Sequence, residues 1–447
     1  MKINTNSRRK FLKRSVLSGI GIGLASGMRS TIFAGYVKNT DTPAILGGQK
    51  VRTKGWPDWP VWDPKTDEEF VIKVLRSGMW SRKHVVDEFE EKWAKMIGSK
   101  RCLTTVNGTN ALICALHNLN IGGGDEVITS PFTFIATALS IIQNGAMPIF
   151  ADINPETRQI DPEKIEEKIT SRTRAILPVH IYGLPSDMDR IMEIARKYNL
   201  FVVEDACQAW LAEINNKKVG TFGHAGCFSF QNSKHLPMGE GGAIVSDDEK
   251  YMDRCYTYHN FGNMKIVGTK LRLTEYQAAI GLVQMKRLEK ETTLRNKNAE
   301  YLKSKLENIP GIIPCRLYNN VTRASYHSFP FSYKKEEFKG LSRENFIKAL
   351  TAEGIPNGIG YTAGLHDLPY LQDAFQSKNF RKIYPKKMLD FQRYVERNRC
   401  PETDKICKET NVRITQNLLL GTKSDIDDII RAIEKIHANA DLLKSRL

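Results

Sequence analysis

The sequence predicts an α/β protein whose larger part is built on a mostly parallel, doubly wound sheet. Between residues 102 and 246, short apolar runs alternate with segments whose apolar residues recur at helical spacing. Strands that alternate with helices in this way form parallel sheets with helices on both faces. After residue 273 the pattern is first helical and then mixed, which predicts a smaller α+β part near the C-terminal end.

The composition is that of a folded globular protein, with 41% hydrophobic and 26% charged residues among 447. It excludes a disordered, collagen-like or small disulfide-stapled protein as the main description. After residue 36, no apolar run approaches the ~20 residues that a membrane helix needs. The net charge is +16, but residues 1–35 hold seven Lys or Arg and no acidic residue. The rest is only mildly basic, so the charge does not predict nucleic-acid binding.

The N-terminal segment resembles an export signal. Residues 7–13 read Ser-Arg-Arg-Lys-Phe-Leu-Lys, which matches the twin-arginine pattern. The apolar stretch Val16–Ala25 is too short and too rich in glycine for a transmembrane span. Residues 1–35 therefore predict a periplasmic or exported protein and a contact with the twin-arginine export machinery; a basic tail is the alternative. Ile32-Phe33-Ala34 lacks the small residue of a cleavage site, so an uncleaved membrane anchor stays open.

The large part contains seven expected strands with helices between them. The strands are Cys102–Val106, Glu126–Thr129, Met147–Ile153, Arg174–Tyr182, Leu200–Glu204, Gly226–Phe230 and Gly242–Ser246. The helices are Thr109–Leu119, Phe134–Gln143 and Asp187–Tyr198. Little separates the last two strands, which predicts one antiparallel edge.

The C-terminal part begins with a long helix, Glu275–Leu306, and a domain boundary is expected near residue 295. The N-terminal arm and large domain would then span residues 36–295, and the small domain residues 296–447. The expected elements of the small domain are the strands Ser328–Ser332 and Val412–Leu420 and the helices Ser342–Glu353 and Ser424–His437. Ser424 is the expected N-cap of the last helix.

Two motifs lie at strand ends, where ligands bind in open α/β folds. In Val106-Asn107-Gly108-Thr109 a strand stops at a glycine and a helix starts at a threonine. The N–H groups of Gly108 and Thr109 would face outward at a helix N-terminus, which binds phosphate. Taken alone, the motif also fits a capped turn. Phe134, just after the next strand, suits either a cover for a flat ring ligand or a core position.

Two further motifs bring titratable groups to the same edge. The apolar strand before Gln208 ends in Glu204 and Asp205, and a buried carboxylate needs a cation such as a protonated pyridine nitrogen. A surface salt bridge is the alternative. Lys234 follows the apolar segment containing Ser229 and precedes a glycine-rich turn. Desolvation there would lower its pKa and free the amine to form a Schiff base; most other lysines are solvated.

In kind and in chain order, these four motifs resemble the pyridoxal phosphate site of the DegT/DnrJ/EryC1/StrS family of sugar aminotransferases. The resemblance runs from about residue 46 to residue 437 and includes Gly123–Ile128, Val179–Gly183 and Gln277–Gly281. It implies a fold-type I pyridoxal phosphate-dependent transferase, with a seven-stranded sheet in the large domain. It also implies a small C-terminal α+β domain and a homodimer with shared active sites.

The resemblance assigns roles to the residues that carry chemistry. Lys234 resembles the lysine that forms a Schiff base with pyridoxal phosphate. Asp205 resembles the carboxylate that keeps the pyridine nitrogen protonated, and Gln208 resembles the hydrogen-bond donor to the phenolic oxygen.

Other positions resemble ligands of the phosphate and ring. Gly108, Thr109 and Ser229 stand at the phosphate-binding positions, and Phe134 at the position of the stacking aromatic. Lys270 stands where the family has an asparagine that reaches the phosphate across the dimer. A cation there can meet the phosphate or point away.

Four segments resemble one branch of the family, the glutamine:scyllo-inosose aminotransferases and aminohydroxybenzoate synthases. They are Leu46–Arg52, Trp56–Trp62, Ser77–Arg82 and Asn417–Gly421. This branch implies transfer of an amino group from glutamate or glutamine to a keto-sugar or ketocyclitol. The export signal favours a free periplasmic keto-sugar over a nucleotide sugar.

Two alternative functions are weighed against transamination. Pyridoxal-dependent sugar dehydratases of the family replace the lysine by histidine; here Lys234 is present and His235 is its neighbour, which favours transamination. A non-catalytic pyridoxal-binding sensory protein is less compatible with an intact set of site residues, and no helix-turn-helix pattern indicates DNA binding.

The eight cysteines contain no Cys-x-x-Cys pair, so no metal is expected. Cys400 and Cys407 are close enough to pair in an oxidising compartment.

Overall fold

The computed structural model describes residues 41–447. The predicted twin-arginine signal, residues 1–35, lies outside the described residues. Within residues 41–447, no helix combines the length and the apolar character needed to cross a membrane. All eight cysteines lie in this part and are free, Cys400 and Cys407 included.

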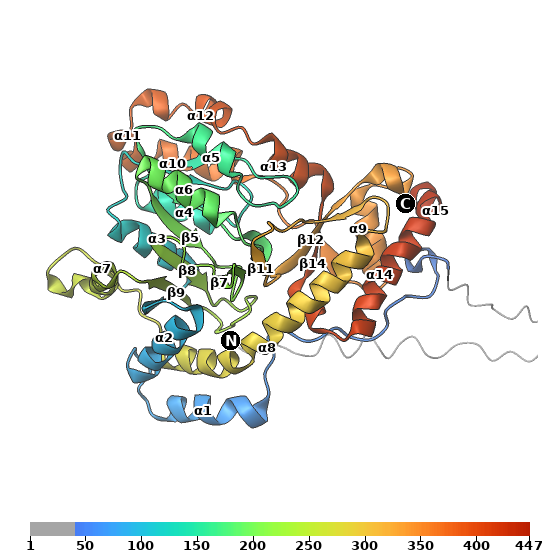
Figure 1. The fold of residues 1–447 in the computed structure, drawn as a ribbon, viewed down its shortest axis with the longest axis horizontal. Coiled ribbons are helices and arrows are strands. Elements are labelled where there is room, and N and C mark those ends of the chain that lie inside the picture. Colours follow the sequence, from blue (N-terminus) through green and yellow to red (C-terminus); the bar gives the residue numbers. More distant parts are fainter. Residues whose placement is uncertain (1–40) are drawn as a thin grey trace, which may run out of the picture. The chain divides into compact units, whose positions relative to one another are not determined.

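A seven-stranded sheet forms the larger layer (Figure 1). Its strands are β1 (Arg101–Thr105), β2 (Glu126–Thr129), β3 (Met147–Phe150), β4 (Thr173–Leu177), β5 (Phe201–Asp205), β8 (Ala225–Ser229) and β9 (Gly242–Ser246). The order is β1-β9-β8-β5-β4-β2-β3, and the five strands from β8 to β3 are parallel. The seven strands confirm the prediction, but the antiparallel strand is not the edge. β9 runs antiparallel to both β8 and β1. It is not the edge strand, because β1 pairs along its outer side.

Helices cover both faces of this sheet, as alternating apolar strand residues require. On one face, α3 (Gly108–Asn118) and α7 (Glu249–His259) pack on Val203, Cys227 and Ile244. On the other face, Val202, Phe228 and Val245 meet a larger set of helices. These are α2 (His84–Ile97), α5 (Pro162–Lys168), α6 (Met188–Tyr198) and α8 (Glu275–Leu306). The helix α1 (Pro64–Arg76) packs on α8, whereas α4 (Ala136–Gln143) packs on α3, with Ile141 in the cluster of the first face.

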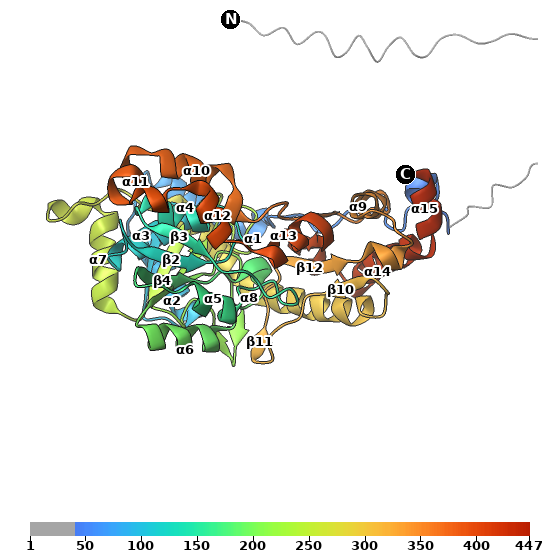
Figure 2. The same cartoon turned by 90° about the horizontal axis from the view of Figure 1, so that it is seen from above.

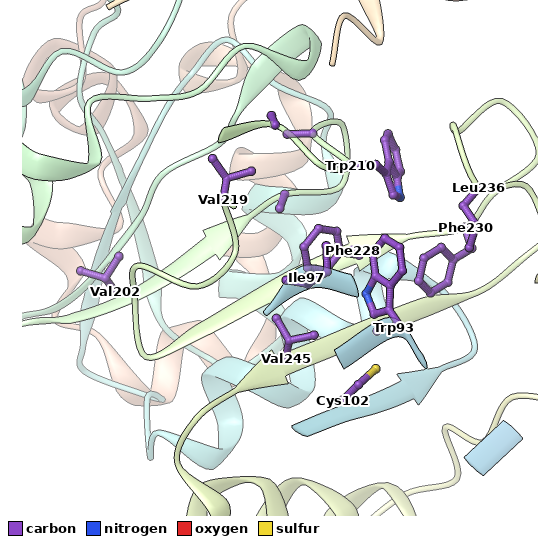
Figure 3. Close-up of a cluster of buried hydrophobic side chains, with 14 of the residues drawn as sticks. Trp93, Ile97, Cys102, Val202, Trp210, Val219, Phe228, Phe230, Leu236 and Val245 are labelled. Atoms are coloured by element: carbon purple, nitrogen blue, oxygen red, sulfur yellow. The ribbon is translucent and has the colours of Figure 1, made fainter. Parts of the chain in front are cut away.

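The aromatic core under β8 is drawn in Figure 3. Trp93 of α2 packs edge-on against Phe228, with ring centroids 5.2 Å apart, and against Phe230, 5.4 Å apart. Both phenylalanines are fully buried. Because burial of such rings contributes several kcal/mol, the end of β8 and the chain that follows it are held firmly in place.

The 32-residue helix α8 runs from the large sheet to a second, four-stranded sheet (Figures 1 and 2). That small sheet consists of β10 (Ile312–Pro314), β12 (Ser328–Tyr333), β14 (Asn411–Thr415) and β13 (Asn357–Gly358), in this order. Its helices are α9 (Arg343–Ala352), α14 (Lys423–Ala438) and α15 (Ala440–Arg446). A separate three-stranded sheet joins β11 (Val321–Arg323), β6 (Glu213–Ile214) and β7 (Lys217–Lys218).

Several expected boundaries are wrong, and the strand expected over Met147–Ile153 ends at Phe150. The strand expected over Val412–Leu420 ends at Thr415, and Gln416–Leu420 is a 3-10 helix. The last long helix begins at Lys423, with Thr422 and not Ser424 as its N-cap, because Thr422 and Asp425 form a capping box. The strand expected to reach Tyr182 ends at Leu177, and the helix expected from Phe134 starts at Ala136.

One segment of the C-terminal part packs on the large sheet. It contains α10 (Pro369–Gln376), α11 (Lys378–Ile383), α12 (Phe391–Arg397) and α13 (Pro401–Lys405). Phe375, Phe380 and Tyr394 belong to the same core as the large-sheet strands. Arg397 binds both oxygens of the buried carboxylate of Glu126 at 2.8 and 3.0 Å. The segment from α10 to α13, which lies between β13 and β14 in the sequence, thus covers the edge of the large sheet.

Candidate active site

A cavity of about 790 Å³ lies between the carboxyl end of the large sheet and the small sheet. Seven of the eight predicted site residues line it. They are Gly108, Thr109, Phe134, Asp205, Gln208, Ser229 and Lys234. We call the five of these from the strand ends and their turns, Gly108, Thr109, Asp205, Ser229 and Lys234, the large-sheet wall. The opposite side, the small-sheet wall, consists of His327, Ser328, Tyr361, Arg413 and Asn417.

The first turn of α3 opens into the cavity. Asn107 caps the helix by accepting from the N–H of Asn110, so Gly108 and Thr109 are its first two residues. Their N–H groups have no helical acceptor, and the helix dipole adds positive potential. A Cβ at Gly108 would lie 2.8 Å from the Cβ of Ser229 and 2.9 Å from the sulfur of Cys207. Glycine therefore lets this helix start close against the end of β8.

Asp205, at the end of β5, carries a buried carboxylate with neutral partners only. One oxygen accepts from the hydroxyl of Thr137 at 2.7 Å and the other from the N–H of Cys207 at 3.2 Å. Within residues 41–447, no cationic side chain forms an ion pair with it. A buried carboxylate without a cation is costly, so this position is suited to a cationic ligand group.

The neighbouring carboxylate, Glu204, is used differently. It is fully buried and accepts from the N–H groups of Gly220, Phe222 and Gly223 at 2.7 to 2.8 Å. The imidazole of His180 lies 3.1 Å from it. Because side chains alternate along a strand, Glu204 and Asp205 point to opposite sides, and only Asp205 reaches the cavity.

Lys234 lies three residues beyond Gln231 in the turn after β8. It is half-buried, and within residues 41–447 no group forms a hydrogen bond or ion pair with its amine. Its nitrogen lies 5.9 Å from the ring centroid of Trp210. Burial lowers the pKa of Lys234, as the sequence predicts, while the nearby carboxylate of Asp205 acts in the opposite direction. An amine with a lowered pKa is a better nucleophile near neutral pH.

Gln208 connects the two walls. Its amide oxygen accepts from the N–H of Tyr182 at 3.0 Å, and its amide nitrogen donates to the hydroxyl of Tyr361 at 3.1 Å. Burial raises the pKa of Tyr361 to about 12, and the charge of Asp205 adds to this. The phenol is therefore a hydrogen-bond donor at neutral pH.

Phe134 and Lys270 differ in placement. Phe134 is 59% exposed, with its ring on the cavity, so it is not a core residue. Lys270 is exposed and does not line the cavity of its own chain; its nitrogen lies 6.0 Å from the ring of Phe261. Lys270 is the one predicted site residue that the fold of a single chain does not bring to the others.

The sequence reasoning missed the small-sheet wall and a buried polar cluster behind Lys234. Both ring nitrogens of His235 and one of His327 are buried without a hydrogen-bond partner in the described chain. Burial lowers the pKa values of both imidazoles well below the ordinary range, and the positive charge of Arg295 acts in the same direction. No local motif marks His327 or Arg413, because their place in the site depends on how the small sheet packs.

Comparisons with known proteins agree with this geometry. Residues 63–433 match the DegT/DnrJ/EryC1/StrS aminotransferase family. An L-glutamine:2-deoxy-scyllo-inosose aminotransferase from Streptomyces kanamyceticus is 33% identical over 420 residues, covering 88% of this chain and 96% of the relative.

Two solved structures share the fold. The crystal structure of 3-amino-5-hydroxybenzoic acid synthase has a TM-score of 0.75 and 27% identity, over 87% of this chain and 100% of that one. A GDP-4-keto-6-deoxymannose-3-dehydratase with a trapped PLP-glutamate geminal diamine has a TM-score of 0.70 and 25% identity, over 85% of this chain and 100% of that one. The family match spans most of the chain and includes the whole large-sheet wall. The chain therefore belongs to the DegT/DnrJ/EryC1/StrS aminotransferase family and is an aminotransferase with the fold-type I architecture.

Proposed function

We propose that this aminotransferase uses pyridoxal 5′-phosphate to move an amino group from glutamine or glutamate to a ketocyclitol or keto-sugar. One observation carries the proposal, because three features face one cavity. They are the buried carboxylate of Asp205, which has no ion-pair partner in the described chain, the half-buried amine of Lys234, and the helix N-terminus at Gly108. Pyridoxal phosphate has a ring nitrogen, an aldehyde and a phosphate that match these three features. The names of the relatives support glutamine as donor and an inosose as acceptor.

The residues present fit this cofactor. The N–H groups of Gly108 and Thr109 and the hydroxyl of Ser229 would hold the phosphate, in the narrow space where a Cβ at Gly108 would collide with Ser229. Asp205 would supply the negative charge beside the pyridine nitrogen. Phe134 would cover one face of the ring.

When bound, pyridoxal phosphate supplies an electron sink for the breaking C–H bond. Asp205 would hold the proton on the pyridine nitrogen. The Lys234 amine would bind the aldehyde carbon and, after release, move the proton at the donor's α-carbon. Gln208 would donate from its amide nitrogen towards the phenolic oxygen. Tyr361 shares that amide hydrogen-bond network and limits where Gln208 can turn.

Dehydration of a keto-sugar is the second candidate, because a dehydratase shares the fold. Lys234 stands at the end of the β8 segment, and the neighbouring His235 is buried behind it, outside the cavity lining. At this point of the chain the amine of Lys234, and not the imidazole of His235, therefore faces the ligand space. This placement favours amino transfer.

The test is the visible absorption of purified protein loaded with pyridoxal phosphate. Addition of L-glutamine or L-glutamate should convert the lysine-bound cofactor to its amino form, with loss of the long-wavelength band. Addition of ketocyclitols or 3- or 4-keto sugars should then restore the band and yield an aminated product in mass spectra. Release of water without amination would support the dehydratase, and a band that no donor changes would support a non-catalytic binding protein.

A homodimer with shared sites belongs to the same proposal. Several apolar side chains are exposed: Phe134 at the cavity, Trp80 between α1 and α2, and Phe261, Met264 and Val267 in the loop before Lys270. A second copy that covers this surface would bury Met264 and Val267, which are 99% and 88% exposed. The same contact would bring Lys270 towards the partner's phosphate. Light scattering should give twice the chain mass, and Met264→Glu with Val267→Glu should give a monomer.

Export by the twin-arginine route also stays a proposal, supported by the sequence of residues 7–13. Arg8→Lys with Arg9→Lys should leave active, cofactor-loaded enzyme in the cytoplasm, since the site is built from residues beyond 41. Cell fractionation measures this. Normal periplasmic delivery of the double variant would remove both the export route and the argument against a cytoplasmic nucleotide sugar.

A further inference from the structure

A histidine and two aspartates meet outside the lining of the active-site cavity, where the short 3-10 helix η5 (Leu365–Asp367) faces α13. One possible ligand atom from each of His366, Asp367 and Asp404 lies within 4.8 Å of the other two. The Nε2 of His366 is 3.6 Å from a carboxylate oxygen of Asp404. Imidazole nitrogens and carboxylate oxygens together form sites for divalent transition metals.

The imidazole of His366 is buried without a hydrogen bond. Its side chain is 2% exposed, and neither ring nitrogen has a hydrogen-bond partner within residues 41–447. Nδ1 is enclosed, whereas Nε2 is directed at Asp404 from beyond hydrogen-bonding distance. Buried polar side chains are nearly always hydrogen-bonded, so this ring is an exception that needs a cause. A cation between Nε2 and the carboxylates would use that nitrogen as a ligand.

The two carboxylates have little else to bind. Asp367 is exposed, and no other side chain of the described part of the chain forms a hydrogen bond or an ion pair with it. Besides His366, Asp404 has only the exposed amine of Lys408, at 4.0 Å, and such surface pairs contribute little. The neighbouring Asp152 differs, because its carboxylate accepts from two N–H groups at the start of α13, at 2.8 and 3.0 Å. Asp367 and Asp404 have no such structural use.

The backbone holds η5 and α13 close together. Leu365 donates its N–H to the carbonyl of Pro131 at 2.9 Å, which fixes η5 beside the large sheet. A Cβ at Gly364 would lie 2.6 Å from Nδ1 of His366 and 2.8 Å from Cγ2 of Thr403, so the glycine lets η5 approach α13. Two ligands bound to one Zn²⁺ at about 2.1 Å lie at most about 4.2 Å apart. Small side-chain rotations would therefore bring the three ligand atoms onto one ion.

We propose that His366, Asp367 and Asp404 bind one divalent transition-metal ion of the Zn²⁺ type. The imidazole favours such an ion over Mg²⁺ and Ca²⁺, which prefer oxygen ligands. Water would complete the coordination on the exposed side. The expectation that no metal binds rested on the cysteine pattern, and this site contains no cysteine. The proposal goes beyond amino transfer and does not depend on it, because none of the three residues lines the cavity.

The ion would join the two ends of one segment. η5 precedes α10, and Asp404 follows α12, so His366 and Asp404 stand at the base of the helices α10, α11 and α12 beside the large sheet (Figure 1). A cross-link between the ends of a segment restricts its opening. The metal would therefore stabilise the part of the chain that covers the edge of the large sheet.

Calorimetry on EDTA-treated holoenzyme of the full chain tests the site. Zn²⁺ should bind with one ion per chain and at least about tenfold more tightly than Mg²⁺ or Ca²⁺. Asp367→Asn and Asp404→Asn should each weaken Zn²⁺ binding about tenfold or more, because each removes a charged ligand. His366→Asn should abolish the preference for Zn²⁺. Asp373→Asn, which changes an exposed aspartate of α10, is the matched control and should bind Zn²⁺ as the wild type does.

Limited proteolysis gives a second readout that requires neither turnover nor a folded His366 variant. Residues 378–399 lie between the two ends and hold eight Lys or Arg at which trypsin can cut. Zn²⁺ should slow cleavage there about tenfold in the wild type and in Asp373→Asn, but not in Asp404→Asn. Absence of Zn²⁺ binding, equal binding of Zn²⁺ and Ca²⁺, or unchanged Zn²⁺ affinity in both Asp367→Asn and Asp404→Asn would overturn the proposal.

Discussion

The two walls of the cavity differ in how their polar groups are held. On the large-sheet wall, Asp205 accepts two hydrogen bonds, of 2.7 and 3.2 Å, and Gly108 is packed too tightly to accept a side chain. On the small-sheet wall, Arg413 makes one bond of 3.4 Å and a ring nitrogen of His327 makes none. The first wall is preorganised for a single ligand. The small-sheet wall has unused hydrogen-bond donors. Such donors suit a wall that must accept two chemically different substrates in turn.

Removal of Lys234 tests the large-sheet wall most severely. We expect Lys234→Ala to reduce turnover at least about 10³-fold, because both the covalent anchor and the proton carrier are lost. The fold and some non-covalent cofactor binding should persist. Steady-state kinetics, with absorption and circular dichroism spectra, measure this. Lys250→Ala, an exposed lysine of α7, is the control, and turnover within tenfold of wild type in Lys234→Ala would remove the residue from its role.

The adjacent carboxylates offer a sharper test. Asp205→Asn should lose on the order of 10²-fold or more in turnover while retaining the cofactor, because a neutral amide does not stabilise a protonated ring nitrogen.

Glu204→Gln should behave in the opposite way. Loss of charge at an acceptor of three N–H groups should reduce the free energy of unfolding by about 1–3 kcal/mol, with near-normal turnover of the folded fraction. Thermal unfolding and kinetics on both variants measure the contrast. If both variants lose activity and stability to the same extent, the assignment of a structural role to Glu204 and a catalytic role to Asp205 is wrong.

Gly108→Ala should have a smaller effect, confined to the proposed phosphate site at Gly108, Thr109 and Ser229. The new methyl group would meet Ser229 and Cys207 at less than 3.0 Å, so the first turn of α3 must shift. We expect about a tenfold rise in the dissociation constant for pyridoxal phosphate, measured by titration of apoprotein. Gly55→Ala is the control, because nothing lies within 4 Å of a Cβ built there. Unchanged cofactor affinity in Gly108→Ala would place the phosphate elsewhere.

The smallest expected effect is a shift in pH dependence. Burial lowers the pKa of Lys234 and the charge of Asp205 raises it. Protonated lysine is unreactive, so the rate of cofactor incorporation into apoprotein should rise with pH through the pKa of Lys234. In Asp205→Asn the raising charge is absent, and the same rise should occur at lower pH. A shift towards higher pH would mean that the two groups do not interact as the structure places them.

Local sequence was sufficient for most of the large-sheet wall. The glycine before α3, the carboxylates that end β5 and the lysine after β8 stand at fixed offsets from apolar strands, and parallel strands bring their carboxyl ends together. The same reasoning failed where elements compete for a boundary. Thr422 caps α14 because its hydroxyl and Asp425 form a reciprocal box, which the apolar pattern alone does not distinguish from a cap at Ser424.

The sequence by itself determined the fold class, the seven strands and the residues of the large-sheet wall, because each depends on periodicity and on turns within a few residues. Tertiary structure alone decided that Glu204 stabilises a loop while Asp205 faces the cavity, that β9 lies inside the sheet, and that Arg413, His327 and Tyr361 form the opposite wall. These last residues come from segments more than 100 positions beyond Asp205. Their position depends on how the small sheet packs against the large one through α8, and no local pattern contains that information.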